Sequence, residues 1–92
     1  MNQNYVVRAD RAGVFFGEIK ENKGTSVVMT NVRKIHYWEG AAAVEQIAMS
    51  GISGSSRLTV VVPEMEIMTP IQIIPCSEQA TQNLKGWNEW KR

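Results

Sequence analysis

The sequence has few of the residues that build catalytic and metal sites. Its 92 residues include a single cysteine, Cys76, and a single histidine, His36. One cysteine cannot close a disulfide within a chain, so a disulfide-rich secreted scaffold is excluded. Zinc sites combine several cysteine and histidine ligands, and the motifs of P-loop, serine-hydrolase and zinc-protease sites are absent. We therefore expect a protein that is not an enzyme, with no metal, no cofactor and no catalytic residues.

The chain also lacks an excess of charge and a long apolar run. Ten Lys and Arg residues against nine Asp and Glu leave a net charge of +1, which is too balanced for a protein that holds nucleic acid by bulk charge. No apolar run approaches the roughly 20 residues that span a bilayer. The N-terminal sequence M-N-Q-N-Y-V-V-R lacks the basic and apolar regions of a signal peptide. We expect neither nucleic acid nor a membrane as partner, and a cytoplasmic location.

What is present is the composition of one small globular domain. Hydrophobic residues make up 43% of the chain, as is usual for such domains. We expect a single domain over residues 1–92, with residues 1–4 frayed and residues 88–92 forming a tail. A chain this short buries only about 60–65% of the surface that its unfolded form exposes. Five Met and three Trp exceed what so small a core needs, so we expect a homo-oligomer.

Alternating and β-branched segments predict a chain rich in strands. Gly17 lies inside one of them and predicts a bulge or a close approach of another backbone. Asn31 is expected to end one strand before the next begins, and residues 52–56, which are rich in Gly and Ser, are expected to form a mobile loop. Segment 57–62 is expected to be a central strand. The predicted strands are 5–9, 14–20, 25–30, 32–38, 57–62, 64–69 and 71–74.

Two short helices are predicted among these strands. The first covers residues 41–49, with a buried stripe of Val44, Ile47 and Ala48, and ends at Gly51. The second covers residues 78–85 and has Ser77 as its N-cap. The fold class is therefore α+β: a small, mainly antiparallel, twisted sheet with one or two short helices packed on it.

The segment from Val32 to Gly51 is the candidate ligand site. Strand alternation places Arg33 and Tyr37 on one face and Lys34, His36 and Trp38 on the other. Cationic side chains, flat rings and the free N–H groups of a helix start are a combination that binds an anion or a nucleotide. In the alternative, the rings cover a sheet edge, a glycine permits a turn and Glu39 takes the positive helix end. The predicted ligand-binding residues are Arg33, Lys34, His36, Tyr37, Trp38 and Gly40, with Arg8 and Arg11 as further contributors.

Four other residues or pairs have both a functional and a structural interpretation. A lone His36 has no partner for general-base chemistry and fits a surface residue better. Cys76 precedes a helix N-terminus, which can activate a thiol, but a buried inert cysteine is the commoner case. Glu64 and Glu66 could share acid and base work, or simply form a solvated strand face. Aromatic residues close the chain, and both Trp87 and Trp90 are candidate interface residues. For Trp87 the alternative, that it packs back onto the sheet as a clasp, is favoured, and for Trp90 an interface is favoured.

A resemblance to a known family is carried by three segments: A-G-V-F-F-G-E-I-K, T-N-V-R-K-I-H-Y-W-E-G-A-A-A-V-E-Q-I-A-M-S-G and I-Q-I-I-P-C-S-E-Q-A. Through them the chain, from about Tyr5 to Trp87, resembles a family of short uncharacterised proteins of tailed phages and prophages. That family commonly has an aromatic residue where this chain has His36, which argues against essential chemistry by His36. The resemblance implies a phage protein acting in the host cytoplasm and implies no particular activity.

Two functional hypotheses follow, and a third is weaker. Phages carry many proteins of this size that inhibit host defences, some by sequestering nucleotide signals and some by blocking a host protein. The first hypothesis is a non-enzymatic, oligomeric binding protein that captures a small anionic ligand such as a nucleotide signal. The second is an inhibitor of a host protein, or a structural accessory protein, with no small ligand. The third is a nucleic-acid binder, against which the near-neutral charge counts.

Overall fold

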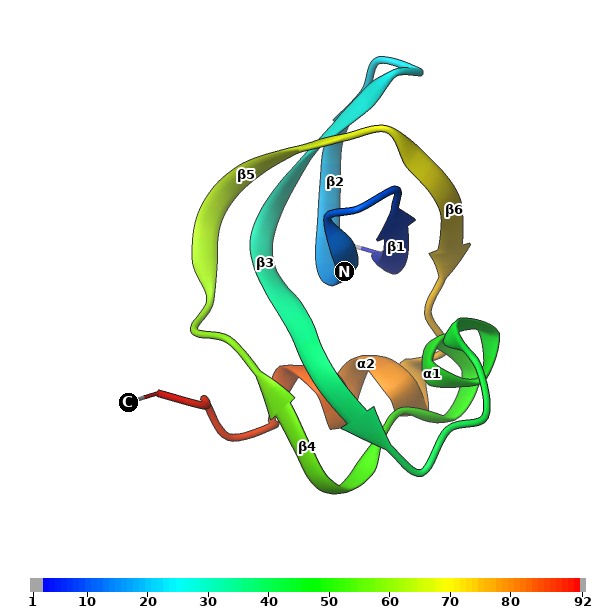
Figure 1. Ribbon diagram of the computed structural model, residues 1–92, viewed down its shortest axis with the longest axis vertical. Coiled ribbons are helices and arrows are strands. Elements are labelled where there is room, and N and C mark those ends of the chain that lie inside the picture. Colours follow the sequence, from blue (N-terminus) through cyan, green and yellow to red (C-terminus); the bar gives the residue numbers. More distant parts are fainter. Residues whose placement is uncertain (1–2, 92) are drawn as a thin grey trace.

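One antiparallel sheet and two short helices make up most of the computed structural model, which describes residues 3–91 (Figure 1). This architecture confirms the predicted α+β class. Within residues 3–91 no helix combines the length and the apolar character that crossing a bilayer would require. The elements in chain order are β1 (Asn4–Ala9), β2 (Gly13–Asn22), β3 (Ser26–Glu39), α1 (Val44–Ser50), β4 (Ser53–Leu58), β5 (Val62–Met68), β6 (Pro70–Pro75) and α2 (Glu78–Lys85).

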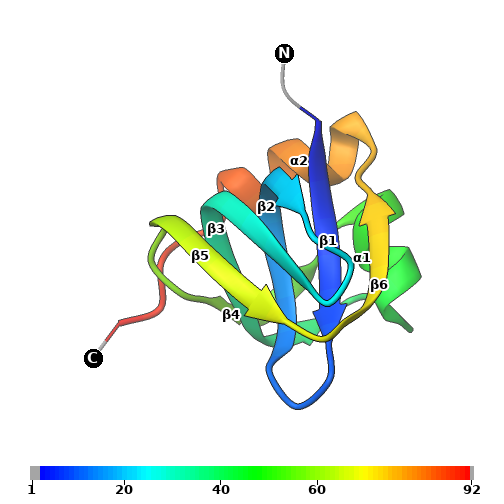
Figure 2. The same cartoon turned by 90° about the horizontal axis from the view of Figure 1, so that it is seen from above.

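The long strand β3 organises the sheet. Its first half pairs with β5 and its second half with β4, while β2 lies along its other side. The strand order is β4-β3-β2-β1-β6, with β5 joined to β3 outside this path. The sheet curls, so that β5 and β6 lie at opposite edges yet are linked by the single residue Thr69, which has a φ of 54° (Figures 1 and 2).

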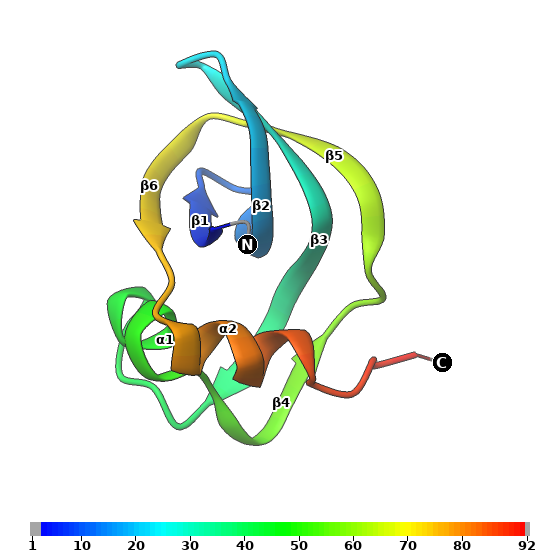
Figure 3. The same ribbon diagram turned by 180° about the vertical axis from the view of Figure 1, so that it is seen from behind.

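Each face of the curled sheet carries a buried apolar cluster. On one face α1 and α2 pack side by side, and the sheet residues Val6 and Phe16 join the helix residues Ile47 and Leu84 in one apolar cluster (Figure 3). On the other face the sheet closes on itself around a second cluster. Strand alternation explains the division, because each next residue points to the opposite face. The second cluster contains Val7, Ala9, Phe15, Val27, Met29, Val32 and Ile67.

Gly17 lies at a bulge between β2 and β3, as predicted. The pairs Phe16–Arg33 and Glu18–Thr30 flank it, so Gly17 lies opposite two residues of β3 rather than one. A Cβ atom at Gly17 would lie 2.9 Å from the Cα atom of Val32 and 3.0 Å from the carbonyl oxygen of Thr30. The predicted break at Asn31 is wrong, because the bulge absorbs its φ of 48° and β3 continues through it.

The second half of the chain departs most from the predicted strands. Segment 52–56 is not a loop but largely forms β4, because it pairs with the end of β3. Segment 57–62 is not a central strand: it holds the end of β4, an exposed connection containing Val60 and Val61, and the first residue of β5. Asn4 is not frayed, since it is buried within β1. The remaining terminal expectations for residues 1, 2 and 92 lie outside the described residues.

The helix α1 has the predicted buried face but begins at a different residue. Ala43 is in an extended conformation, so α1 begins at Val44, three residues later than predicted. Its buried residues are Val44, Ile47 and Ala48, which confirms the predicted stripe. The N-cap of α2 is also confirmed, because the Ser77 hydroxyl oxygen accepts a hydrogen bond of 3.0 Å from the backbone N–H of Ala80.

Candidate functional site

Arg33, the first predicted ligand-binding residue, lies in the interior. Its side chain is 2% exposed. The Nε atom donates to the carbonyl oxygen of Thr59 at 3.0 Å, and Nη1 donates to the carbonyl oxygen of Leu84 at 2.7 Å. Burial lowers the pKa of the guanidinium, and the charge of Glu89 opposes this shift. The expectation of an accessible cation here is therefore wrong, because Arg33 points to the helix-covered face and ties the end of α2 to the β4–β5 connection.

The predicted helix-start site does not assemble either. Gly40 has a φ of 84° and lies against Ser53, so it serves the tight turn rather than an open approach. The helix α1 has only seven residues, and the N–H of Ala42 just before it already donates to the Gln46 side chain at 2.8 Å. Trp38 is partly buried against the core between sheet and helices. The turn at Gly40 and the partly buried Trp38 agree with the structural alternative for this segment. The part of that alternative that placed Glu39 at the helix start is wrong, because the Glu39 carboxylate accepts from the Ser55 N–H and the Tyr37 hydroxyl instead.

The other predicted cations lie at a different end of the sheet. Arg8 is exposed on β1, and Arg11 is exposed in the turn between β1 and β2. Lys34 is partly buried, and its Cε atom lies 3.0 Å from where a Cβ atom of Gly13 would be. Lys34 therefore lies beside the β1–β2 turn rather than with Tyr37. The predicted set of residues does not converge on one ligand.

Four exposed side chains do converge, from β3, β4 and the C-terminal tail. The rings of His36 and Trp90 stack with centroids 4.9 Å apart and planes inclined by 9°. The Cζ atom of Arg57 lies 5.3 Å from the centroid of the Trp90 ring and 6.0 Å from that of Tyr37. Tyr37 is 46% exposed and Trp90 is 36% exposed. We call His36, Tyr37, Arg57 and Trp90 the aromatic–arginine surface.

A bulge in the β3–β4 pairing places two of these residues on one side. The pairs Ile35–Leu58 and Tyr37–Arg57 follow one another, so β3 has one residue more than β4 between them. That residue is His36. At such a bulge strict alternation fails, and both His36 and Tyr37 are exposed.

The tail completes the surface by lying along β4. Trp87 donates its indole N–H to the carbonyl oxygen of Ser56 at 2.9 Å and packs partly buried on the core, which confirms its predicted position. The backbone N–H of Trp90 donates to the carbonyl oxygen of Leu58 at 2.8 Å. Glu89 forms a parallel bridge with the same residue. The tail thus occupies the outer edge of β4 and presents the Trp90 ring outward.

The charges around this surface have both signs. Glu39 accepts from the Tyr37 hydroxyl at 2.6 Å and from the backbone N–H of Ser55 at 2.9 Å. The Ser55 and Tyr37 hydrogen bonds lower the pKa of Glu39, and the bond to Glu39 raises the pKa of Tyr37. Arg57 is exposed and forms no ion pair with any other residue of segment 3–91. Its guanidinium donors are therefore open to an acceptor from outside.

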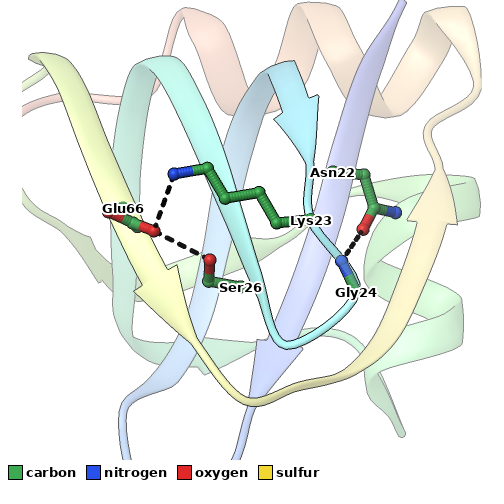
Figure 4. A network of polar contacts seen from close by, with 5 residues as sticks. All are labelled: Asn22, Lys23, Gly24, Ser26 and Glu66. Atoms are coloured by element: carbon green, nitrogen blue, oxygen red, sulfur yellow. Dashed lines mark hydrogen bonds and ion pairs between the residues drawn. The ribbon is translucent and has the colours of Figure 1, made fainter.

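The remaining candidates have structural roles. Burial raises the pKa of the Cys76 thiol to about 12, which is the opposite of activation. Glu64 pairs with Lys20 at 3.1 Å. Glu66 accepts from the Ser26 hydroxyl at 2.8 Å and pairs with Lys23 at 3.4 Å beside the β2–β3 turn (Figure 4). Both carboxylates thus belong to a solvated, ion-paired face.

Neither the potential metal ligands of residues 3–91 nor a cleft beside α2 adds a second candidate site. No group of three or more His, Cys, Asp or Glu side chains in this part of the chain is arranged to hold a metal ion. A cleft of about 480 Å³ lies between α2 and the start of β1, where Glu78 and Gln82 contribute to its wall. None of the predicted ligand-binding residues lines it. The aromatic–arginine surface remains the place where chemically distinctive exposed side chains meet.

Sequence reasoning identified three members of this surface and missed Arg57. It missed Arg57 because the composition of segment 52–56 predicts a loop, which leaves the partner strand of Tyr37 unassigned. The exposed, ion-pair-free arginine follows only from the pairing of Tyr37 with Arg57 across β3 and β4.

Comparison with known proteins gives one family assignment. A family model described as a domain of unknown function (DUF6948) matches residues 2–84. No curated protein and no solved structure matches the chain significantly.

Proposed function

The chain belongs to the DUF6948 family, and we propose that it is a non-enzymatic binding protein whose aromatic–arginine surface holds a protein partner. The observation that carries this proposal is the exposed cluster itself. Trp90 and Tyr37 flank an arginine whose donors have no internal carboxylate among residues 3–91. Tryptophan, tyrosine and arginine are the residues that most often dominate protein–protein binding energy.

The arrangement of the cluster supports binding with a low entropic cost. The His36 stack and the backbone hydrogen bond to Leu58 hold Trp90 before any partner arrives. The hydrogen bond to Glu39 likewise fixes the Tyr37 ring. Side chains that are already ordered lose less conformational freedom on binding, which leaves more of the contact energy as affinity.

The surrounding charges favour a protein over a polyanion. Glu39, Glu89 and Lys91 lie around the surface, and Arg57 lies within it. A polyanion such as nucleic acid is held mainly by a concentration of positive charge, and mixed signs would weaken that attraction. A polar rim of both signs around exposed aromatic rings is the usual composition of a protein interface.

The resemblance to tailed-phage and prophage proteins provides the setting of the proposal. In that setting the protein acts in the host cytoplasm, and the partner is a host protein or another subunit of the same protein. This setting is a proposal that rests on the resemblance alone.

A second candidate is capture of a small anionic ligand such as a nucleotide. One observation favours it: the Arg57 guanidinium lies beside the exposed Tyr37 ring. A base could stack on the ring while the guanidinium binds a phosphate. The candidate is weaker than the first, because Arg33, Lys34 and the start of α1 do not join this place.

Site-specific photo-crosslinking tests the first candidate. A photo-reactive amino acid replaces Tyr37 in one variant and the exposed Glu21 of β2 in a control. We expect an adduct of defined mass in cells from Tyr37 and none from Glu21. Absence of any adduct from Tyr37, or the same adducts from both positions, would refute the proposal.

A thermal-shift screen against nucleotides separates the second candidate from the first. A ligand that binds only the folded state adds about 2.7 kcal/mol of stability at one hundred times its dissociation constant. A shift that disappears in the Arg57→Ala variant would favour nucleotide capture. A flat screen, together with the Tyr37 adduct, would leave the protein-binding candidate alone.

A further inference from the structure

We infer that the partner of the aromatic–arginine surface is a second copy of this chain, related to the first by a two-fold axis. This inference rests on the proposed function and names its partner. Two observations carry it, the apolar extension of the surface and its mixture of charges.

The surface continues into exposed apolar residues. Val60 and Val61, in the connection between β4 and β5, are 42% and 46% exposed. The tail that carries Trp90 runs beside this connection in two perpendicular views (Figures 1 and 2). The hydrogen bond from Trp90 to Leu58 places the tail next to the same connection. The exposed valines of this connection therefore lie on a segment of backbone next to the tail that carries Trp90.

The dimensions of the molecule set how much of it a dimer interface would cover. A stable interface buries about 800 Å² on each partner, which is about a seventh of the 5433 Å² accessible surface of this chain. The molecule measures 34 × 29 × 27 Å, so such an interface takes most of one side. Burying one side of the molecule in a dimer would also stabilise the fold, because the small size of the chain limits its buried core.

The charges make the surface complementary to itself. Arg57 has no ion-pair partner within residues 3–91. Glu89 forms an ion pair with the exposed Lys91, at 3.3 Å, and its charge also acts on the buried Arg33 guanidinium. Surface pairs such as Glu89–Lys91 contribute little to stability. In a two-fold dimer each copy offers both groups, so any contact between them occurs twice. We assign Arg57 of one copy to Glu89 of the other, with the stacked rings and valines between the two pairs.

Sedimentation equilibrium over a wide range of protein concentration tests this pairing. We expect the wild-type mass to approach that of two chains as concentration rises. Arg57→Glu should weaken the dimer at least about tenfold, because it places like charges in contact. Arg57→Glu combined with Glu89→Arg should recover most of the wild-type affinity. Arg11→Glu makes the same charge change on an exposed residue away from the surface and should leave the dimer unchanged.

A second variant changes no charge, so the test does not depend on a charge reversal that could misfold the protein. Trp90→Ala keeps the backbone hydrogen bond to Leu58 and removes only the ring, and it should also weaken the dimer. Wild-type protein that stays monomeric at every concentration would overturn the inference. So would dimers of Arg57→Glu and Trp90→Ala that are as tight as the wild type. Failure of the double variant to recover would overturn the assigned pair.

The crosslinking experiment distinguishes failure of this inference from failure of the proposed function. A Tyr37 adduct with twice the mass of the chain supports both. A Tyr37 adduct of another mass, with monomeric wild-type protein, overturns the second-copy inference and leaves the proposed function standing. No adduct and no dimer would overturn both.

Discussion

Replacing Gly17 by alanine should destabilise the fold strongly, because three backbone atoms of β3 surround the place of the new methyl group. The methyl carbon would lie 2.9 Å from the Cα atom of Val32, 3.0 Å from the carbonyl oxygen of Thr30 and 3.1 Å from that of Asn31. Ordinary contacts are about 3.5–4.0 Å between carbon atoms. None of these atoms belongs to a side chain that could turn away, so β2 and β3 would have to separate.

The expected cost lies at the upper end of the range for overpacking. Added methyl groups in packed interiors usually cost about 1–3 kcal/mol, and we expect about 3 kcal/mol here because rigid backbone must move. For a domain of this size each kcal/mol lowers the melting temperature by roughly 4–8 °C. Gly17→Ala should therefore melt on the order of 15 °C below the wild type. Urea unfolding followed by circular dichroism measures the free energy, and a thermal scan measures the melting temperature.

A second glycine provides the control for this measurement. Gly86 has a φ of −84°, and a Cβ atom there would meet only the carbonyl oxygen of Gln82, at 3.3 Å. Gly86→Ala should change the free energy of unfolding by less than about 1 kcal/mol. If Gly17→Ala were as stable as Gly86→Ala, the bulge geometry on which β3 depends would be incorrect.

Three further predictions concern buried and ionised groups. Arg33→Met removes two hydrogen bonds that a buried guanidinium donates to carbonyl oxygens. It should lower the free energy of unfolding by about 2 kcal/mol, because the lost hydrogen bonds outweigh the gain from no longer burying a charge. Unchanged stability in urea would contradict this role of Arg33. Burial raises the pKa of the Cys76 thiol to about 12. At neutral pH this thiol should therefore react with a thiol reagent only when the protein unfolds. Rapid labelling of the native protein would be inconsistent with the burial of Cys76. Hydrogen bonds lower the pKa of Glu39 and of Glu66 in the folded state. The two carboxylates therefore contribute to the free energy of unfolding above the unfolded pKa of about 4.3, and this contribution is lost as the pH falls through the folded pKa values. The urea midpoint should therefore drop at acid pH, and drop less in the Glu39→Gln, Glu66→Gln variant; equal drops would show that other groups are responsible.

Local sequence signals were sufficient for features that depend on neighbouring residues. The serine cap of α2 and the buried stripe of α1 follow from spacing within one helix. The role of Gly17 was also readable, because a glycine inside a strand often marks a bulge or a close approach of another backbone. In each case the determining contacts lie within one element or one adjacent strand pair.

Features that depend on residues far apart in the sequence could not be predicted in the same way. Arg33 is buried because the end of α2, some 50 residues later, accepts its hydrogen bond. The strand β4 exists because Ser53 to Leu58 find the second half of β3. The exposure of both His36 and Tyr37 needs a bulge that breaks alternation, and the position of Trp90 needs the tail to lie along β4. The alternation of side chains along a strand does not by itself reveal the bulge or the position of the tail.

The proposed protein-binding function and the second-copy inference both depend on one arrangement, in which Trp90 stacks on His36 beside Arg57. The most direct test is the proton NMR spectrum of the His36 ring in wild-type protein and in Trp90→Ala. At a centroid distance of 4.9 Å and an inclination of 9°, the indole ring should move the His36 ring signals upfield, and Trp90→Ala should return them toward the values of an exposed histidine. Unshifted His36 signals in the wild type, or signals that Trp90→Ala leaves unchanged, would show that the aromatic–arginine surface is not assembled in solution.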